Sequence, residues 1–323
     1  MAGAFSVVRL AAFLASGWPS GSVKRQANMN YVVAVSGGVD SVVLLDMMVR
    51  KKIAIPSNND LRGLTFGDKD TLVVAHFDHG IRPDSAADAR FVAALAAHYG
   101  LPARLKREEL GAGASEALAR ERRYAFLREV AARYDAEIVT AHHLDDLVET
   151  IAINLIRGTG WRGLAVLGDS TVHRPLLGLT KMDLYTYAAK QNLEWVEDET
   201  NQQDDYLRNR LRRRIQPEIS LALKQELAER RDRQLQLTKE IDEEAKPLLK
   251  DNELAASRYF FTMIDETSAL ELLRGLTGGH LTRPQLLALW YGIKTARPSS
   301  RQQIGGGLHV HFVRREFIVK SDD

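Results

Sequence analysis

The first two thirds of the chain alternate short apolar runs with longer segments whose apolar residues recur at helical spacing. The runs predict strands at Tyr31–Val35, Leu72–Phe77, Pro102–Leu105 and Glu137–Ala141. The periodic segments predict helices at Asp40–Val49, Asp84–Tyr99, Ser115–Tyr134 and Leu144–Arg157. Such alternation is typical of an α/β fold of the Rossmann-like kind, with a parallel sheet covered by helices on both faces.

The pattern changes near Pro217. A long, highly charged segment with sparse apolar positions predicts a connecting helix from Leu221 to about Lys246, and a small α+β unit follows it. Its expected elements are two helices and a hairpin: Ser268–Leu276, Pro284–Tyr291, and Leu308–Val313 with Glu316–Lys320. We therefore expect an extension at 1–28, a catalytic domain at 29–216 and a C-terminal part at 217–323.

The first residues, Met1 to Ser16, resemble a signal peptide only faintly. No basic region precedes the apolar stretch, and Arg9 interrupts it. Met29 stands directly before the first expected strand. We interpret residues 1–28 as a dispensable extension and expect a cytoplasmic protein.

Composition narrows the possible chemistry. Among the 323 residues, 45% are hydrophobic and 27% charged, which is ordinary for a soluble globular protein. No apolar run is long enough to span a membrane, so we expect no membrane partner. The absence of cysteine excludes a disulfide scaffold, a thiol nucleophile and a cysteine-ligated cluster. The net charge of +2 names no partner, so any nucleic-acid signal must be local.

The strongest local signal lies between the first strand and the first helix. Glycines let a backbone approach a ligand closely, and the first turn of a helix offers unpaired N–H groups to an anion. No lysine follows the segment, so it is not a Walker loop. A tight turn that needs glycine sterically would look similar, but hydroxyls and a carboxylate in this context favour phosphate binding. The residues are Ser36, Gly37, Gly38, Val39, Asp40 and Ser41.

Polar residues follow two further strands. His76, Asp78, His79 and Arg82 come at the end of the second strand, where they could frame a nucleotide's base, ribose or α-phosphate. After the fourth strand, Asp146 and Glu149 share one helix face. These two carboxylates could receive a cationic substrate or Mg²⁺, although helix capping is the alternative.

Arginines provide the third signal. Arg120 lies on the Ser115–Tyr134 helix, where a solvated face is the alternative to substrate contact. A run near the end of the α/β domain places five arginines in seven residues, as expected for a surface that neutralises nucleic-acid phosphates. Lys224, Arg230, Arg231 and Arg233 could extend this basic track. The run consists of Arg208, Arg210, Arg212, Arg213 and Arg214.

Taken in order, the motifs resemble one family. They read SGGVDS from Ser36, HFDHGIR from His76, ARERRY from Ala119, AHHLDDLVET from Ala141 and RGTG from Arg157. RPLL from Arg174, WVED from Trp195 and NRLR from Asn209 complete the series. The first motif resembles the pyrophosphate loop (PP-loop) of the N-type ATP pyrophosphatases. The ordered set resembles the tRNA(Ile)-lysidine synthetases.

The resemblance implies a two-step ligation. ATP would adenylate the C2 oxygen of the wobble cytidine in an isoleucine tRNA with a CAU anticodon, releasing pyrophosphate. The amine of L-lysine would then attack C2 and expel AMP, leaving lysidine and changing the codon and amino-acid specificity of the tRNA. The implied ATP site comprises the loop with His76, Asp78 and His79, and Asp40 would also hold Mg²⁺.

The resemblance also assigns the other roles. Asp40, Asp146 and Arg120 would be catalytic, and Asp146, Glu149 and Arg120 would bind lysine. The arginine run would bind tRNA(Ile). The oligomeric state stays open, a homodimer included.

Two alternatives remain. One is another PP-loop enzyme, such as a tRNA thiolase or an amidating synthetase. The missing cysteine counts against thiolation, and no N-terminal glutaminase nucleophile supports amidation. The other is a nucleotide- or RNA-binding module without turnover, against which the intact Asp40, Asp146 and Glu149 argue.

Overall fold

The computed structural model describes residues 29–50, 54–57, 60–65, 71–80, 85–111, 113–159, 161–197, 207–214, 218–245, 254–279 and 281–321. The expected extension at 1–28 and Arg82 lie outside the described residues. The chain divides into two units, Met1–Arg231 and Asp232–Asp323, and the division falls within one long helix. The functional domain limits expected from the sequence stay a prediction.

The first unit is built on a five-stranded sheet of order β5-β4-β1-β6-β7. Each neighbouring pair in it is parallel, as the alternation of strands and helices predicts. Its strands are β1 (Asn30–Ala34), β4 (Thr71–Asp78), β5 (Ala103–Arg107), β6 (Ala136–Val139) and β7 (Val172–His173). A separate antiparallel pair is formed by β2 (Ala54–Ser57) and β3 (Asp60–Thr65).

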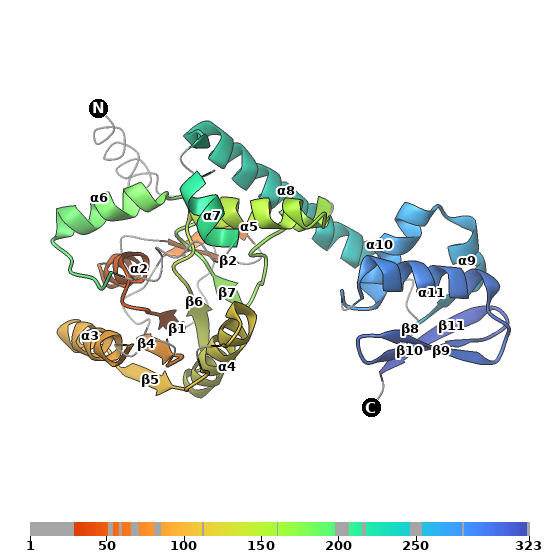
Figure 1. Cartoon of the computed structure of the whole chain (residues 1–323), viewed down its shortest axis with the longest axis horizontal. Coiled ribbons are helices and arrows are strands. Elements are labelled where there is room, and N and C mark those ends of the chain that lie inside the picture. The colour runs from red at the N-terminus through yellow and green to blue at the C-terminus, as the bar shows by residue number, and fades with distance from the viewer. Residues whose placement is uncertain are drawn as a thin grey trace. The chain divides into compact units, whose positions relative to one another are not determined.

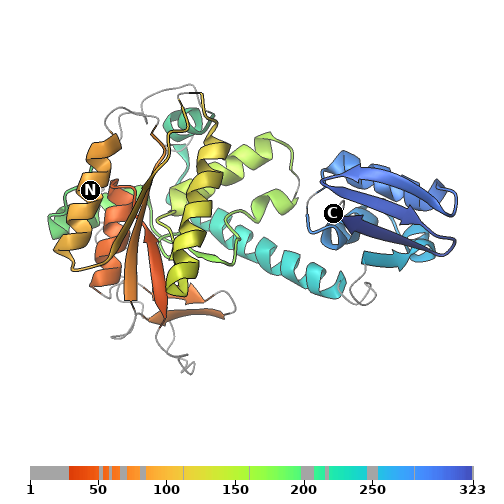
Figure 2. The same ribbon diagram turned by 90° about the horizontal axis from the view of Figure 1, so that it is seen from below.

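Helices cover both faces of this sheet (Figure 1, and turned in Figure 2). Alternate β1 residues explain the layering: Val33 packs with α2, α3 and α6, whereas Val32 packs with α4 on the other face. The Rossmann-like fold class is therefore confirmed. The helices are α2 (Val39–Val49), α3 (Ser85–His98), α4 (Glu116–Tyr134), α5 (Leu144–Ile156), α6 (Lys181–Gln191) and α7 (Leu207–Arg214), with a 3-10 turn, η1 (Trp161–Leu164).

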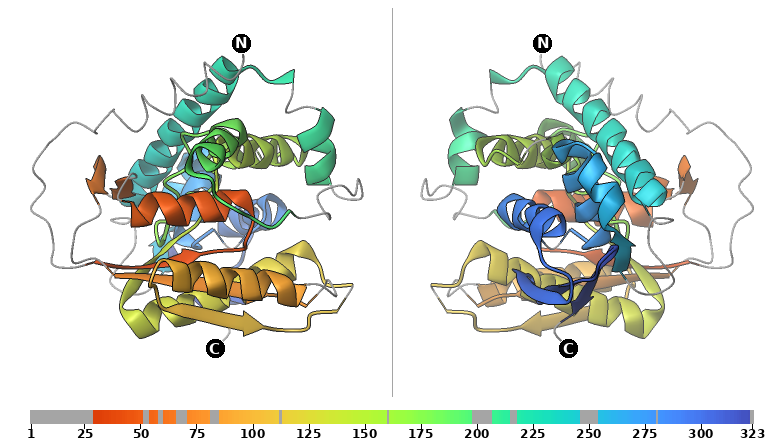
Figure 3. Two further views of the ribbon diagram at one scale, coloured as in Figure 1. Left: turned by 90° about the vertical axis from the view of Figure 1, so that its left-hand side faces the viewer. Right: turned by 90° about the vertical axis from the view of Figure 1, so that its right-hand side faces the viewer.

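Helix α8 (Leu221–Ala245) confirms the expected long helix. The second unit has an antiparallel sheet of order β8-β11-β10-β9. Its helices α10 and α11 lie on one face of that sheet, seen from two more sides in Figure 3. The expected hairpin is β10 paired with β11. The elements are β8 (Leu254–Ser257), α9 (Arg258–Met263), α10 (Glu266–Leu276), α11 (Arg283–Thr295), β9 (Ser300–Gly305), β10 (Leu308–Phe312) and β11 (Glu316–Ser321).

Several elements were not expected from the sequence: β2, β3, β7, α6, α7, α9, β8 and β9. Of these, α6 matters most for the site. It is an 11-residue helix with a reciprocal cap, in which Asp183 accepts from the Thr180 backbone N–H and Thr180 Oγ1 accepts from that of Asp183. The T-x-x-D spacing was the available sequence signal for this helix start.

None of the helices within the described ranges is both long enough and apolar enough to cross a membrane.

Candidate active site

The loop from Ser36 to Ser41 links the end of β1 to the start of α2, as predicted. Ser41 holds it together: its Oγ accepts from the backbone N–H groups of Ser36 (3.1 Å) and Gly37 (3.2 Å), and donates to Gly38 O (2.9 Å). Ser41 is buried and Ser36 is exposed. The loop is thus shaped from within, and Ser36 is its hydroxyl on the solvent side.

Gly37 has a φ of +97°, a conformation that side chains disfavour. A Cβ built there would lie 3.6–3.7 Å from Phe91, Val92 and Val196, which is ordinary contact. Backbone conformation, rather than lack of space, therefore demands glycine at this position. The carbonyl of Gly37 also accepts from Val196 N–H at 3.0 Å, which ties the loop to the segment after α6.

The end of β4 lies beside this loop because β1 and β4 are paired neighbours. His76 Nδ1 is 2.8 Å from Val35 O, and its buried Nε2 has no hydrogen-bond partner among the described residues. His76 and Asp78 line a pocket of about 230 Å³ with side chains from α3 and β5. The pocket's other lining residues are Ala86, Ala89, Leu105, Lys106 and Arg107.

Asp78 is held from two sides, by Gly80 N–H (2.9 Å) and by Arg107 (3.0 Å). Burial alone would raise the pKa of Asp78, but the hydrogen bonds from Gly80 and Ser85 and the charge of Arg107 lower it overall. Asp78 is therefore an anion at neutral pH, committed to shaping this pocket. His79 follows it at the same strand end.

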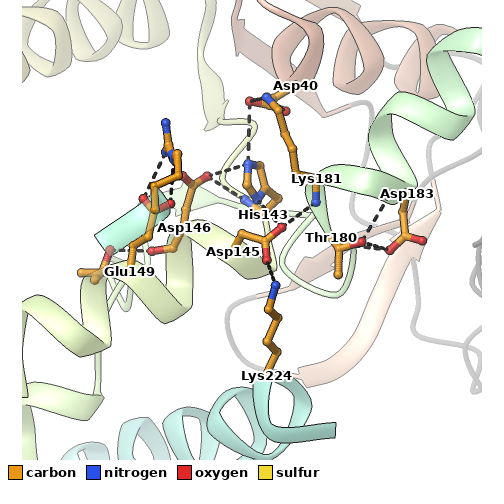
Figure 4. A network of polar contacts seen from close by, with 11 residues as sticks. Asp40, His143, Asp145, Asp146, Glu149, Thr180, Lys181, Asp183 and Lys224 are labelled. Carbon is orange, nitrogen blue, oxygen red and sulfur yellow. Dashed lines mark hydrogen bonds and ion pairs between the residues drawn. The ribbon is translucent and has the colours of Figure 1, made fainter. Parts of the chain in front are cut away.

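His143, at the start of α5, lies among three carboxylates (Figure 4). Its Nε2 is 3.4 Å from Asp146 and 3.7 Å from Asp40, and its Nδ1 is 3.8 Å from Asp145. The PP-loop side and the α5 side of the site therefore meet at this ring. The sequence predicted that both lie at one edge of the sheet, and their convergence on His143 is the structural finding.

Asp145 is a buried structural anchor. It accepts from Lys224 Nζ of α8 at 2.6 Å and from the backbone N–H of Lys181 at 2.7 Å. Lys224 was expected to extend a basic surface, yet only 14% of its side chain is exposed in this ion pair. The carboxylate thus joins the starts of α5, α6 and α8.

Lys181 is the member of this polar cluster that sequence reasoning missed. Its Nζ donates to both carboxylate oxygens of Asp40, at 2.7 and 2.8 Å, from a position 141 residues away in the chain. The capped helix start at Thr180 was the only local hint of its position. Asp40, the expected magnesium ligand, therefore already has a cationic partner from within the chain.

Arg212 reaches the same site from α7. It makes a two-point contact with Glu149, Nε to Oε1 at 2.8 Å and a terminal nitrogen to Oε2 at 3.0 Å. It also lies 3.6 Å from Asp146. Arg210 and Arg213 are exposed on the same helix, whereas the side chains of Arg208 and Arg214 lie outside the described ones. The arginine run thus has one member at the carboxylates and two on the surface.

Arg120 lies on Tyr124, one turn further along α4, with its guanidinium carbon 4.7 Å from the ring centre. Its charge also acts on His142, which bonds Thr140 Oγ1 through Nδ1 at 2.8 Å. The pKa of His142 is lowered to about 3, chiefly by burial and further by the charges of Arg174, Arg120 and Arg123, which together outweigh the opposing effect of Asp146. His142 is therefore neutral at physiological pH. Arg120 lies near enough for its positive charge to act on this ring.

Asp146 differs from the other carboxylates of the site in its contacts with cations. Burial alone would raise its pKa, but His143, His142 and Arg212, with the hydrogen bond from His143 N–H at 3.1 Å, lower it overall. It is therefore an anion at neutral pH. Among the described residues, its lysine or arginine contact is with Arg212, at 3.6 Å. Asp40, Asp145 and Glu149 each have a lysine or arginine nitrogen within 2.8 Å.

The described residues hold no group of three or more His, Cys, Asp or Glu side chains arranged for a metal ion. Mg²⁺ is commonly bound by one or two carboxylates together with substrate phosphates, so this finding leaves the magnesium expectation untested.

Comparison with known proteins now adds to this geometry. The family model described as a PP-loop domain matches residues 9–219, which is more than half of the 323-residue chain. The chain belongs to the PP-loop family. The match includes the loop from Ser36 to Ser41.

The relatives narrow the resemblance further. A tRNA(Ile)-lysidine synthase of Methylococcus capsulatus is 37% identical over 199 residues, covering 59% of this chain and 42% of that protein. The protein of the same name from Exiguobacterium sibiricum is 38% identical over 192 residues, covering 58% and 42%. That of Enterococcus faecalis is 39% identical over 201 residues, covering 59% and 41%. The predicted resemblance is confirmed, and the match spans about two fifths of these relatives.

Proposed function

We propose that this protein ligates L-lysine to C2 of the wobble cytidine of an isoleucine tRNA with a CAU anticodon. ATP is cleaved to AMP and pyrophosphate, and the tRNA passes through an adenylated form. The observation that carries the proposal is the position of His143, within 3.4–3.8 Å of Asp40 on the PP-loop side and of Asp145 and Asp146 on the α5 side. One reaction centre can therefore serve both half-reactions.

In the first half-reaction, the cytidine C2 oxygen attacks the α-phosphorus of ATP and pyrophosphate leaves. Ser36–Ser41 binds the phosphates, using backbone N–H groups at the start of α2 and the hydroxyl of Ser36. His76, Asp78 and His79 bind the base and ribose side of ATP. The pocket at the end of β4 supports this placement, as does His76 Nε2, which no described residue engages in a hydrogen bond.

Mg²⁺ belongs to the proposal as a partner of Asp40. The donor chemistry fits, because carboxylate oxygens suit this hard cation and Asp146 is close by. A bound Mg²⁺ would neutralise negative charge on the phosphates. Asp40 would hold it, and His143 and Lys181 fix where Asp40 points.

In the second half-reaction, the lysine amine attacks C2, the C2–O bond to AMP breaks, and the amine loses a proton. Asp146 receives the ammonium of lysine, since its carboxylate is anionic and no lysine or arginine of the described part of the chain lies within 2.8 Å of it. Glu149 contributes through its contact with Arg212, which orients that guanidinium toward Asp146. Arg120 offers positive charge to the adenylated intermediate.

The tRNA backbone contacts the arginine run. Arg210 and Arg213 are exposed and suit this role directly. Arg208, Arg212 and Arg214 belong to the same proposal, with Arg212 also paired to Glu149. We further propose a cytoplasmic enzyme and leave a homodimer as one possible assembly.

The decisive experiment is nucleoside analysis of isoleucine tRNA after incubation with the protein, ATP and lysine. Lysidine and stoichiometric AMP are the expected products. Asp40→Ala and Ser36→Ala should abolish AMP formation while the circular dichroism spectrum stays native. Formation of ADP and phosphate would contradict the PP-loop assignment of ATP cleavage. AMP without lysidine would favour another PP-loop modification, and ATP binding without cleavage would favour the module without turnover.

A further inference from the structure

Helices α2 and α6 are joined by two polar contacts of the same sequence offset. Asp40 binds Lys181 at the start of both helices, and Asp46 accepts from Tyr187 further along, at 2.7 Å. Each pair is separated by 141 residues in the chain. An equal offset at two points means that the helices run in the same direction and keep a constant register. We name these two contacts the α2–α6 rungs.

The second rung centres on a carboxylate with no solvent exposure. Asp46 also accepts from Tyr99 at the end of α3 (2.7 Å) and from Arg50 of its own helix (2.7 Å). Burial, and then the hydrogen bond to Asp46, raises the pKa of both tyrosines, so both hydroxyls keep their protons and donate. Three donors therefore satisfy this carboxylate.

A buried carboxylate is an expensive way to hold helices together, because apolar packing of similar volume usually does as well. What apolar packing lacks is a fixed register, since hydrogen bonds to a carboxylate define position more sharply than contact does. Here the register determines where Lys181 lies along α2. At its own rung, Lys181 is fixed at both ends, by the Asp145 bond to its backbone N–H and by Asp40 at its Nζ.

We propose that Asp46 and Tyr187 are positioning residues that set Lys181 beside the PP-loop, where its ammonium contributes to binding the phosphates of ATP. The proposal rests on the proposed ATP site and adds Lys181 to it. Asp40 lies in the second position of α2, so its partner Lys181 is also close to the backbone N–H groups at that helix start. An ammonium there adds charge where anions gather.

The chain offers a matched control. Tyr187 and Tyr99 each donate one hydroxyl to Asp46 at 2.7 Å, but Tyr187 belongs to α6 with Lys181, whereas Tyr99 follows α3. Tyr187→Phe and Tyr99→Phe thus remove equivalent bonds from one buried carboxylate. Both should lower the melting temperature to a similar extent. Only Tyr187→Phe should weaken binding of α,β-methylene-ATP with Mg²⁺, on the order of tenfold by calorimetry.

A double-mutant cycle separates positioning from general damage. Lys181→Met should also weaken the analogue, and Tyr187→Phe should add little in that background because its effect acts through Lys181. Equal loss of affinity in Tyr187→Phe and Tyr99→Phe, or an undiminished effect in the Lys181→Met background, would overturn the proposal. Unchanged affinity in Tyr187→Phe would do the same.

If Tyr187→Phe does not fold, the affinity of Lys181→Arg for the ATP analogue tests the proposal instead. This variant keeps the charge but not the position of the ammonium, so affinity should stay as low as in Lys181→Met; affinity equal to the wild type would overturn the proposal. Analogue binding is read without tRNA or lysine. A protein that binds the analogue but makes no lysidine would contradict the proposed function while leaving this inference to its own test.

Discussion

The guanidinium of Arg212 covers Glu149 with two hydrogen bonds, and the Glu149 side chain is only 1% exposed. The pair joins α7 to α5 across 63 residues of chain. A residue chosen from the sequence as a phosphate contact therefore also neutralises a buried acid.

Arg212→Ala should accordingly cost stability. It leaves a buried carboxylate without its cation, which we expect to lower the free energy of unfolding by about 1–3 kcal/mol. Arg210→Ala is the control, because Arg210 is exposed on the same helix and should change stability by less than about 0.5 kcal/mol. Urea denaturation measures both. Equal stability of the two variants would show that Glu149 does not need Arg212.

The surface arginines should control tRNA affinity instead. Arg210→Ala with Arg213→Ala should weaken tRNA binding and reduce its log–log salt dependence by about one unit for each lost phosphate contact. Affinity for the ATP analogue should not change. A filter-binding titration over salt concentration provides the measurement, and an unchanged slope would mean that these arginines face only solvent.

Asp146→Asn should separate the two half-reactions. Loss of the charge removes the partner proposed for the lysine ammonium, so the lysine concentration needed for half-maximal rate should rise by about tenfold or more. Adenylated tRNA should still form. Single-turnover assays at varied lysine follow both species. Blocked adenylation with normal lysine dependence would assign Asp146 to Mg²⁺ or to the fold.

Much of the fold follows from local pattern, but the site does not. Apolar runs such as Tyr31–Val35 predict buried strands. Ser115 predicts a helix start because serine is a preferred N-cap residue, and in the structure its Oγ accepts from Leu118 N–H at 3.2 Å. Lys181 could not be placed in this way. Its partner is 141 residues distant, and no sequence period encodes which helix will lie against α2.

The sequence also could not show which basic residues face solvent and which are held in contacts within the fold. Composition marks the arginine run as basic, but only the packing of α7 on α5 decides which member turns inward. Lys224 and Arg231 illustrate this too: one pairs with Asp145 and the other donates to the carbonyls of Val166 and Leu167. Cations on a charged helix were expected to face nucleic acid, and these two stabilise the first unit.

Acid should destabilise the protein through His142. The unfolded chain takes up this proton below pH 6.5, whereas the folded protein resists it until about pH 3. The stability contributed by the neutral ring is present above pH 6.5 and is lost as pH falls toward 3. His142→Asn should flatten the pH dependence of unfolding between pH 6.5 and 4, and His98→Asn, at an exposed site, should not. Identical pH profiles for all three proteins would contradict this.

The loop glycines should behave differently from one another. Gly37→Ala forces a side chain into a φ of +97° and should lower stability by about 1–2 kcal/mol. At Gly38, φ is −72° and, among the described residues, a Cβ would meet only Ser36 Oγ at 3.6 Å, so Gly38→Ala should fold almost as stably as the wild type. Thermal unfolding compares them, and equal melting temperatures would remove the argument from backbone conformation.

The long sequence separations within the site have a consequence for protein synthesis. Asp40, Glu149 and Asp145 are made well before their respective partners Lys181, Arg212 and Lys224, which follow 141, 63 and 79 residues later. At about 5–20 residues per second, the ribosome delivers these cations several seconds after the acids. A nascent chain that ends before α6 carries the PP-loop and the strands of its sheet, but not the cations that pair with these acids. The ion pairs of the reaction centre can therefore form only after α6, α7 and the start of α8 have been made, and a product truncated before α6 would lack them.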